Sequence, residues 1–318
     1  MRVRPSGRPA PAMRVRSAEE ASELTRAATE SPELRAVGEA LARVPAERWR
    51  GVVEATAASR PVATEWEAMR AACADAGISA ESRALERWLL LQAGLPNLPR
   101  VAGLPLLDEV KGLLYDEFCF VAAPHRRWMA VLDPAHSGFR SMCKLMRLER
   151  FPAGQLHWEV SGYPRSQLLK APPAELPRVL RFVALEMRGL KPYFVTHLAT
   201  RWTVPFTMTE KEDERACYRI ARSMALQPAV RGYMSGSWLN DPELPRVAPH
   251  LAWRLDKVRH GALLTTAGPA PVSSGFLEGS AERRQLYESG AWQPKFGVIL
   301  WPRRQMLAWA SRFQHQPT

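Results

Sequence analysis

The sequence predicts an α/β (or α+β) protein in which a helical N-terminal region precedes a mixed sheet flanked by helices. Residues 17–94 carry helix signals only, whereas from about residue 100 short apolar runs alternate with amphipathic helix patterns. Between the two lies the run 95–106 (LPNLPRVAGLPL), whose three prolines and one glycine predict a linker. We therefore expect a disordered basic tail at 1–16, a helical region at 17–94, the linker, and an α/β catalytic-type domain at 107–318.

The composition is that of a globular and basic protein. Apolar residues make up 46% and charged residues 24% of the 318 residues, which is enough for a buried core. The net charge of +12 comes mostly from arginine. The planar guanidinium of arginine suits phosphates and carboxylates, but a high-GC bacterial genome also encodes arginine often.

Cysteine usage and hydropathy predict the compartment. No apolar run is long enough for a transmembrane helix, and the basic N-terminus lacks the apolar segment of a signal peptide. We expect the cysteines to be reduced and mostly buried because none form a C-x-x-C pair. They are Cys73, Cys119, Cys143 and Cys217. These features predict a soluble cytoplasmic protein.

The N-terminal tail at 1–16 (MRVRPSGRPAPAMRVR) holds mostly arginine, proline and small residues, with no acid until Glu19. Too little apolar surface is available to offset the entropy of ordering it, so we expect it to be disordered and dispensable for folding. Alternatively, it is a basic arm that touches nucleic acid or another anionic surface. Met13-Arg-Val-Arg repeats Met1-Arg-Val-Arg, so either methionine fits as the start.

Helices and strands can be placed from caps and periodicity. Ser17 and Ser31 precede acids in a first turn, as N-caps do, and Thr209 begins a capping-box-like run. Beyond the linker, helices are expected at 107–118, 137–150, 173–188 and 209–226. Strands are expected at 119–123 and 128–132, which form a hairpin-like pair, and at 155–160 and 193–198.

The stretch 227–301 organises the predicted domain. An apolar run at 229–234 leads into a Ser/Gly turn, Ser235-Gly236-Ser237. A helix at 242–258, a strand at 262–266, a helix at 280–289 and a strand at 296–301 are expected to follow. That order is typical of an α/β ligand-binding unit.

Several well-known active-site motifs are absent from the sequence. It has no phosphate-binding G-x-x-x-x-G-K-[ST], no dinucleotide-binding G-x-G-x-x-G and no H-E-x-x-H. Gly236-Ser237 lacks the second glycine of a serine-hydrolase elbow. His157 and Glu159 on one strand face would suit a metal, but the P-C-x-x-C of zinc deaminases is missing, and such a pair is more often a hydrogen-bonded face. We predict no metal.

The order of elements in the stretch 227–301 resembles the second half of the GNAT acyltransferase superfamily. The run 281–292 (AERRQLYESGAW) is similar to that family's A-x-x-L-Y-x-x-x-G-F segment, with Leu286, Tyr287 and Trp292 at matching positions and the glycine displaced to Gly290. In the family this tyrosine often protonates the leaving thiolate of coenzyme A. The run 231–237 (RGYMSGS) stands where the family's R/Q-x-x-G-x-G/A phosphate loop is expected, and departs from it.

The resemblance implies an acyl-CoA-dependent N-acyltransferase that acts on a small molecule in a biosynthetic pathway. Tyr287 would be the acid, and we select His197 as the base because histidine titrates near neutrality, with Glu210 and Asp241 as reserves. Glycines and small residues can present backbone N–H groups to phosphates. The residues predicted to bind acyl-CoA are Arg231, Gly232, Ser235, Gly236, Ser237 and Trp238.

Other functions remain open at the level of sequence. Tyr287 could equally be a half-buried aromatic residue on an amphipathic helix. His197 could be a hydrogen-bonded core histidine, and the tryptophans of the stretch could belong to a hydrophobic core. Arginine pairs such as Arg283-Arg284 and Arg303-Arg304 beside aromatics would suit nucleic acid, although no known nucleic-acid-binding motif is present and the charge is thinly spread. A third alternative is an inactive partner or scaffold protein that docks through its helical region.

Overall fold

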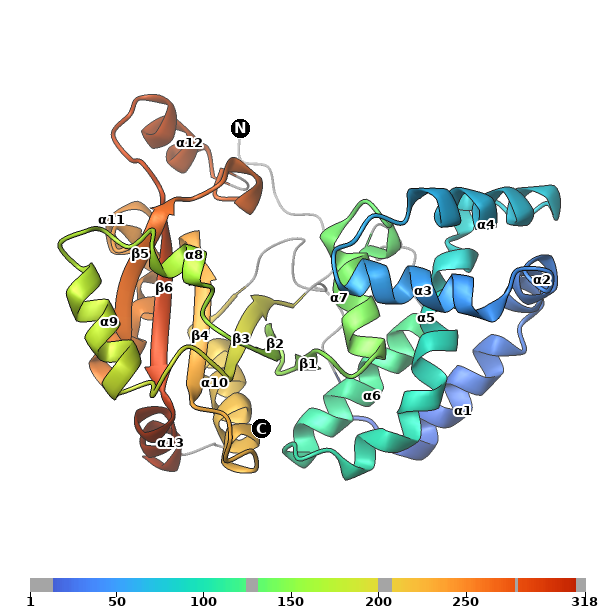
Figure 1. Ribbon diagram of the computed structural model, residues 1–318, viewed down its shortest axis with the longest axis horizontal. Coiled ribbons are helices and arrows are strands. Elements are labelled where there is room, and N and C mark those ends of the chain that lie inside the picture. Colours follow the sequence, from blue (N-terminus) through green and yellow to red (C-terminus); the bar gives the residue numbers. More distant parts are fainter. Residues whose placement is uncertain (1–13, 124–130, 200–207, 278–279, 313–318) are drawn as a thin grey trace. The chain divides into compact units, whose positions relative to one another are not determined.

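The computed structural model describes residues 14–123, 131–199, 208–277 and 280–312 (Figure 1). The chain forms two compact units. The first is built from the residues up to Leu104 together with Asp108–Pro152. The second is built from Pro105–Leu107, Ala153–Leu198 and the residues from 208 onward. The predicted mixed α/β class is confirmed, since the first unit is helical and the second contains a sheet covered by helices.

The first unit is a set of short packed helices. Ser17 accepts a hydrogen bond from the backbone N–H of Glu20, and Ser31 accepts one from Leu34, so both predicted N-caps are confirmed. Trp49 packs edge-on against Trp88 with ring centroids 5.3 Å apart, as expected of core anchors. The helices are α1 (Ala18–Thr29), α2 (Pro32–Ala40), α3 (Ala46–Ala57), α4 (Ala63–Asp75), η1 (Ala80–Ser82), α5 (Ala84–Gly94), η2 (Leu95–Gly103), α6 (Asp108–Ala122) and α7 (Ser137–Met146).

The predicted linker at 95–106 is largely helical. Its first nine residues form the 3₁₀ helix η2, in which Leu98 and Val101 are buried. Pro96 lies in its first turn, where proline is tolerated, and Pro99 lies inside this 3₁₀ helix. The two units divide after Pro152 instead, because α6 and α7 pack with the preceding helices.

The predicted strand at 119–123 is also wrong. Cys119–Ala122 is the last turn of α6, and this turn is buried on all sides. A short apolar run does not distinguish a buried strand from a buried helix, and here the longer run decides for helix. Its partner strand at 128–132 lies mostly outside the described residues, and Val131 and Leu132 form part of a helical turn.

The last residues of the predicted tail are docked on α6. Arg16 donates its backbone N–H to the carbonyl of Gly112 at 3.1 Å, and its Nε to Oδ1 of Asp116 at 2.8 Å. Val15 lies so close to Gly112 that a Cβ there would overlap it. Disorder is therefore wrong for 14–16, and residues 1–13 lie outside the described part of the chain.

The sheet has six strands in the order β1-β2-β3-β4-β6-β5. β2 and β3 are antiparallel, β3 and β4 are parallel, and β6 lies antiparallel between β4 and β5. The predicted strands at 155–160, 193–198, 262–266 and 296–301 are confirmed within a few residues. The strands are β1 (Phe151–Pro152), β2 (Leu156–Ser161), β3 (Tyr193–Leu198), β4 (Gly232–Ser237), β5 (Leu263–Pro269) and β6 (Lys295–Pro302).

Helices cover both faces of the sheet. On one face α9 packs through Val179 and Val183 against Tyr193 and Met234. The opposite face carries Tyr233 and is covered by α10, as Figure 1 shows. The remaining helices of this unit are α8 (Arg165–Leu168), α9 (Leu176–Leu185), α10 (Glu210–Ala225), η5 (Trp238–Asn240), α11 (Leu244–Val247), η6 (Pro249–His260), η7 (Val272–Ser274), α12 (Ala281–Glu288) and α13 (Arg303–Arg312).

A buried ion cluster joins α10 to η6. Asp213 in the first turn of α10 is 2% exposed and pairs with Arg254 at 2.6 Å and with Lys257. Burial alone would raise the pKa of Asp213, but Lys257 and Arg254 outweigh it, so the pKa lies below that of an ordinary aspartate. The cluster ties the start of α10 to η6.

Two further sequence expectations concern cysteines and membrane spans. All four cysteines are free and buried, as predicted. Burial raises the pKa of Cys217 to about 12, so its thiol stays protonated near neutral pH. Within the described ranges, no helix has the length and hydropathy needed to cross a bilayer.

We predict that Arg16→Ala lowers the free energy of unfolding by about 1–3 kcal/mol, because it leaves Asp116, which is 5% exposed, without this hydrogen-bond donor. Urea denaturation of the full chain measures the effect. The control is Arg26→Ala, an exposed arginine on α1 whose loss should change stability by less than about 0.5 kcal/mol. Equal stability of the two variants would show that the docked residues contribute nothing.

We predict that Asp213→Asn lowers the free energy of unfolding by about 3–5 kcal/mol at pH 7, because Arg254 and Lys257 stay buried without their carboxylate. A carboxylate with a depressed pKa stabilises the fold above its unfolded pKa, and this stabilisation is lost as the pH falls through the lower folded value. The gap between wild type and variant should therefore shrink below about pH 4, near the unfolded pKa of aspartate.

Glu243→Gln is the matched control for this ion cluster. It breaks the ion pair with Arg246, whose side chain is 51% exposed, and should cost less than about 1 kcal/mol. Urea denaturation at several pH values compares the two variants. A constant gap across pH would contradict the assignment of the stability to the Asp213 carboxylate.

Candidate functional site

The strands β3 and β4 separate at their carboxyl ends. Their parallel pairing runs from Phe194–Tyr233 to Thr196–Ser235 and stops there. Both strands continue for two more residues, β3 paired to β2 and β4 paired to β6 on their outer sides. Each strand thus keeps its outer partner while losing the inner one. The result is a wedge between two parallel strands in the middle of the sheet, with backbone groups of residues 197–198 and 236–237 along its sides.

His197 lies at this wedge with a carboxylate beside it. It is the next-to-last residue of β3 and pairs directly across from His157 on β2. Its Nε2 lies 3.6 Å from Oε1 of Glu159, and the side chains are 37% and 16% exposed respectively. The distance is that of an ion pair when the imidazole is protonated, and is too long for a hydrogen bond. The Nε2 atom that faces Glu159 is itself buried, so the exposed part of the imidazole lies elsewhere on the ring. A carboxylate beside an imidazole stabilises its protonated form.

The sequence singled out Glu159 only as a possible metal ligand beside His157. Its approach to His197 depends on the register between β2 and β3, which no local pattern reveals. His157 is fully buried, and Glu159 is partly buried on the same face of the strand.

An apolar cluster lies at the same edge of the sheet, and we call it the edge cluster. It gathers residues that follow or precede strand ends: Trp238 after β4, Ala270 after β5 and Trp292 before β6. Leu198 at the end of β3 and Tyr287 on α12 pack against it. The edge cluster consists of Trp238, Leu239, Leu244, Val247, Ala248, Leu251, Ala270, Phe276 and Trp292.

Tyr287 is held by ring contacts. Its ring meets that of Phe276 edge-on at 5.3 Å between centroids, and the residue is partly buried. The structure thus brings Tyr287 to the same edge of the sheet as His197. The packing also agrees with the alternative of a half-buried aromatic, so the role as an acid stays a prediction.

One reserve acid, Asp241, lies beside the edge cluster, and the other, Glu210, lies on the α10 face of the sheet. Asp241 is fully buried and accepts hydrogen bonds from the indole N–H of Trp292 at 3.1 Å and from the backbone N–H of Lys295 at 2.9 Å. Its hydrogen bonds indicate a structural role. Glu210 is the exposed first residue of α10 and lines a small cavity of about 80 Å³ with Lys257. This cavity lies on the α10 face of the sheet, opposite the face that carries His197, so the structure does not bring Glu210 and His197 together.

The predicted turn at 235–237 is wrong, because these residues belong to β4. An extended strand rises about 3.3 Å per residue, so Arg231 and Ser237 are separated by about 20 Å and do not meet one phosphate. The glycines serve packing: a Cβ on Gly236 would lie 2.8 Å from the ring of Phe296, and one on Gly232 would lie 2.8 Å from the methyl of Met187. The glycines that suggested a turn are instead small because large side chains pack against them.

The remaining predicted ligand-binding residues have structural partners. Ser235 accepts a hydrogen bond from Nδ2 of Asn240 at 3.2 Å. Ser237 caps η5 by accepting from the backbone N–H of Leu239 at 3.2 Å. Trp238 is 7% exposed, with the guanidinium of Arg283 over its ring at 5.2 Å. Of the predicted set, Gly236, Ser237 and Trp238 lie at the open end of the wedge.

Comparison with known proteins gives two similar structures. No protein-family model and no curated protein matches this sequence. One solved structure is an acyltransferase in complex with decanoyl-CoA and teicoplanin, 15% identical, with a TM-score of 0.46 over 93% of this chain and 92% of that one. Another is a mutant acyltransferase in complex with octanoyl-CoA, 16% identical with the same TM-score and coverage. A likeness at this level does not assign the chain to a family, and membership of the GNAT superfamily stays a prediction.

Proposed function

We propose that the protein is an acyl-CoA-dependent N-acyltransferase that acts on a small-molecule amine. The observation that carries the proposal is the wedge between the carboxyl ends of β3 and β4. Clefts at the carboxyl ends of parallel strands are a common place for ligands in α/β proteins. An extended ligand that contains amides can pair with the backbone along both sides of such a wedge, as an added strand does. The pantetheine arm of coenzyme A has this character.

The residues around the wedge fit the proton transfers of aminolysis. A bound acyl-CoA would supply a thioester whose acyl carbon forms a bond to the amine nitrogen as the carbon–sulfur bond breaks. His197 would accept the proton that the amine loses, with Glu159 at 3.6 Å stabilising the imidazolium. Tyr287 would donate its proton to the departing sulfur, and backbone N–H groups at the end of β4 would donate to the developing oxyanion.

The phosphate groups of coenzyme A fit the described residues less well. Helix α10 follows β3, but its first turn holds Glu210 and Glu212, which repel an anion at a helix N-terminus. Arg231 lies at the far end of β4. Residues 200–207, between β3 and α10, lie outside the described part of the chain. The described residues therefore fit the pantetheine arm and the acyl group of acyl-CoA better than its phosphates.

We predict that acyl-pantetheine, which carries no phosphate, raises the melting temperature of the full chain, as do coenzyme A and acyl-CoA. A ligand at a hundred times its dissociation constant stabilises the folded state by about 2.7 kcal/mol, which a thermal-shift assay detects. Adenosine phosphates, nicotinamide cofactors, divalent metals and short oligonucleotides form the comparison panel.

Two results of this panel would count against the proposal. Stabilisation by oligonucleotides without any response to pantetheine ligands would favour the nucleic-acid-binding alternative. A response to coenzyme A that is matched by adenosine phosphates, with none to acyl-pantetheine, would show that phosphate contacts alone explain the binding.

We predict that His197→Gln lowers kcat on the order of 10²- to 10⁴-fold, the usual contribution of a general base, with little change in acyl-CoA binding. Free-thiol release from an acyl-CoA in the presence of an amine panel measures the rate. Glu159→Gln should give a smaller fall in kcat, because the imidazole remains. Tyr287→Phe keeps the ring contact with Phe276 and should lower the rate through its lost hydroxyl alone.

The matched control for the base is His250→Gln. His250 is exposed on η6, and its backbone carbonyl rather than its side chain accepts from the indole of Trp253. Its replacement should leave kcat unchanged. Equal rates for His197→Gln and His250→Gln would remove His197 from the mechanism.

A further inference from the structure

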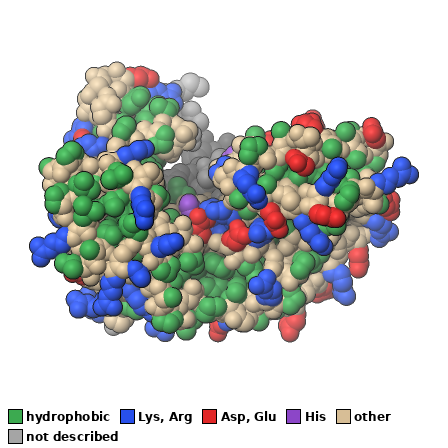
Figure 2. Space-filling model, in the orientation of Figure 1, with side chains coloured by type: hydrophobic (Ala, Val, Ile, Leu, Met, Phe, Trp, Pro, Cys, Tyr) green, Lys and Arg blue, Asp and Glu red, His purple; other side chains and the backbone are tan. Residues whose placement is uncertain are grey.

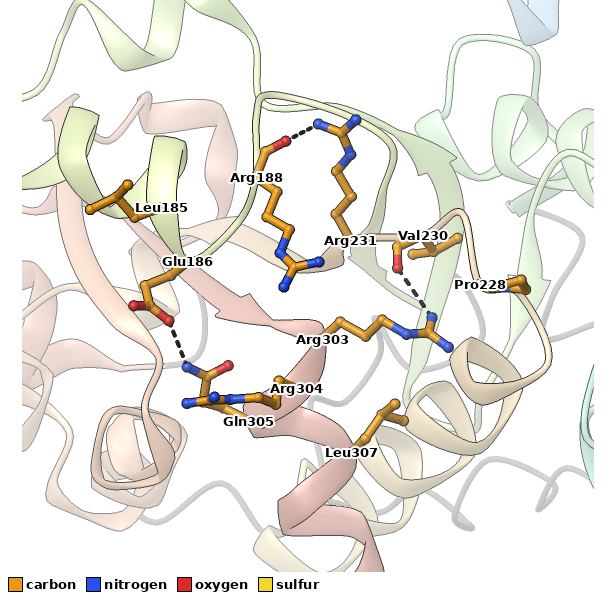
Figure 3. A pocket seen from close by; sticks show the side chains of 10 residues that line it. All are labelled: Leu185, Glu186, Arg188, Pro228, Val230, Arg231, Arg303, Arg304, Gln305 and Leu307. Atoms are coloured by element: carbon orange, nitrogen blue, oxygen red, sulfur yellow. Dashed lines mark hydrogen bonds between the residues drawn. The ribbon is translucent and has the colours of Figure 1, made fainter.

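An arginine-lined cavity lies at the opposite end of β4 from the wedge. It has a volume of about 560 Å³ and is formed by the end of α9, the segment that leads into β4 and the first turns of α13 (Figure 3). Four arginines from these three places line it: Arg188, Arg231, Arg303 and Arg304. We call it the arginine groove.

Two of these arginines are held by the backbone. Arg303 donates from Nη1 to the carbonyls of Met224 at 2.6 Å and Gln227 at 2.8 Å, and so caps the end of α10. Arg231 donates from Nη1 to the carbonyl of Arg188. Gly189 makes room for this contact, because a Cβ there would overlap the guanidinium of Arg231. The groove is therefore built around fixed cations.

The other two arginines are Arg188 and Arg304. Within the described residues, no carboxylate lies within ion-pair distance of Arg188 or Arg304. Figure 3 shows the side chain of Arg188 reaching into the cavity between Arg231 and Arg303. Glu186 is the acid among the lining residues, and its Oε2 accepts from Nε2 of Gln305 at 3.0 Å.

The local charge is unusual for a helix start. The first turn of α13 has no acidic residue and begins with Arg303 and Arg304, although the positive end of the helix dipole disfavours cations there. Together with Arg188 and Arg231, these residues repel one another, and Glu186 is the one acid among the described lining residues that offsets this repulsion. In Figure 2 the surface over α9 and α13, at the lower left, shows Lys and Arg beside hydrophobic side chains.

We propose that the arginine groove binds the phosphate group of a small phosphate monoester. Guanidinium groups bind phosphate oxygens in pairs, and several from different elements can surround one dianion. The volume falls within the range of small-molecule sites, and Leu185, Pro228 and Leu307 supply apolar surface for the organic part. Arg231, predicted as part of a coenzyme A loop, belongs to this groove instead. The proposal is independent of the proposed acyltransferase reaction.

Isothermal titration calorimetry of the full chain tests this with inorganic phosphate, pyrophosphate and phenyl phosphate. We expect phenyl phosphate to bind more tightly than inorganic phosphate, because it also contacts the apolar lining. Arg188→Gln and Arg304→Gln should each weaken phenyl phosphate binding about 10-fold, as for a lost charge-assisted hydrogen bond, and the double variant about 100-fold. Within the described residues neither side chain pairs with a carboxylate, so no ion pair is lost and both variants should keep the melting temperature of the wild type.

Arg181→Gln is the matched control, since Arg181 is exposed on α9 and does not line the groove. It should leave binding unchanged. An equal loss of phenyl phosphate affinity in Arg181→Gln would show that general surface charge causes the binding, and would overturn the proposal. The absence of binding by all three anions to the wild type would also overturn it. The response to acyl-pantetheine in the double variant separates the two sites: an unchanged response supports independence, and a lost response contradicts it.

Discussion

The placement of α10 depends on one buried carboxylate. Asp213 binds two cations from η6 in a buried site, and this interaction holds η6 to the start of α10. Burying three charges costs free energy unless each has its partner. Helix α10 must therefore lie where Asp213 contacts both Arg254 and Lys257.

The wedge at β3 and β4 follows from what each strand is bound to on its outer side. β2 holds β3 as far as Leu198, and β6 holds β4 as far as Ser237, while the inner pairing ends two residues earlier. The apolar residues beyond the strand ends pack into the edge cluster, which keeps the two ends in place. The register between β2 and β3 also brings the side chains of His197 and Glu159 close together.

The sequence predicted the class of fold and most strands and helices, because caps and periodicity are local signals. It did not predict which residues meet, since Glu159 reaches His197 only through strand register. The Ser/Gly run at 235–237 resembled a turn, yet Gly236 is small because Phe296 approaches it. Likewise, the apolar run at 119–123 has no local feature that separates strand from buried helix.

The order of the strands has a consequence for synthesis. β6 comes last of the strands in the chain but lies between β4 and β5, and Figure 1 shows it in the middle of these antiparallel strands. While the chain is being made, β4 and β5 have no partner on their facing edges until residues 295–302 have left the ribosome. Unpaired strand edges favour association with other chains. A nascent or prematurely terminated chain that lacks β6 would therefore need protection by chaperones, whereas the described helices of the first unit all precede residue 153 and can pack before β6 is made.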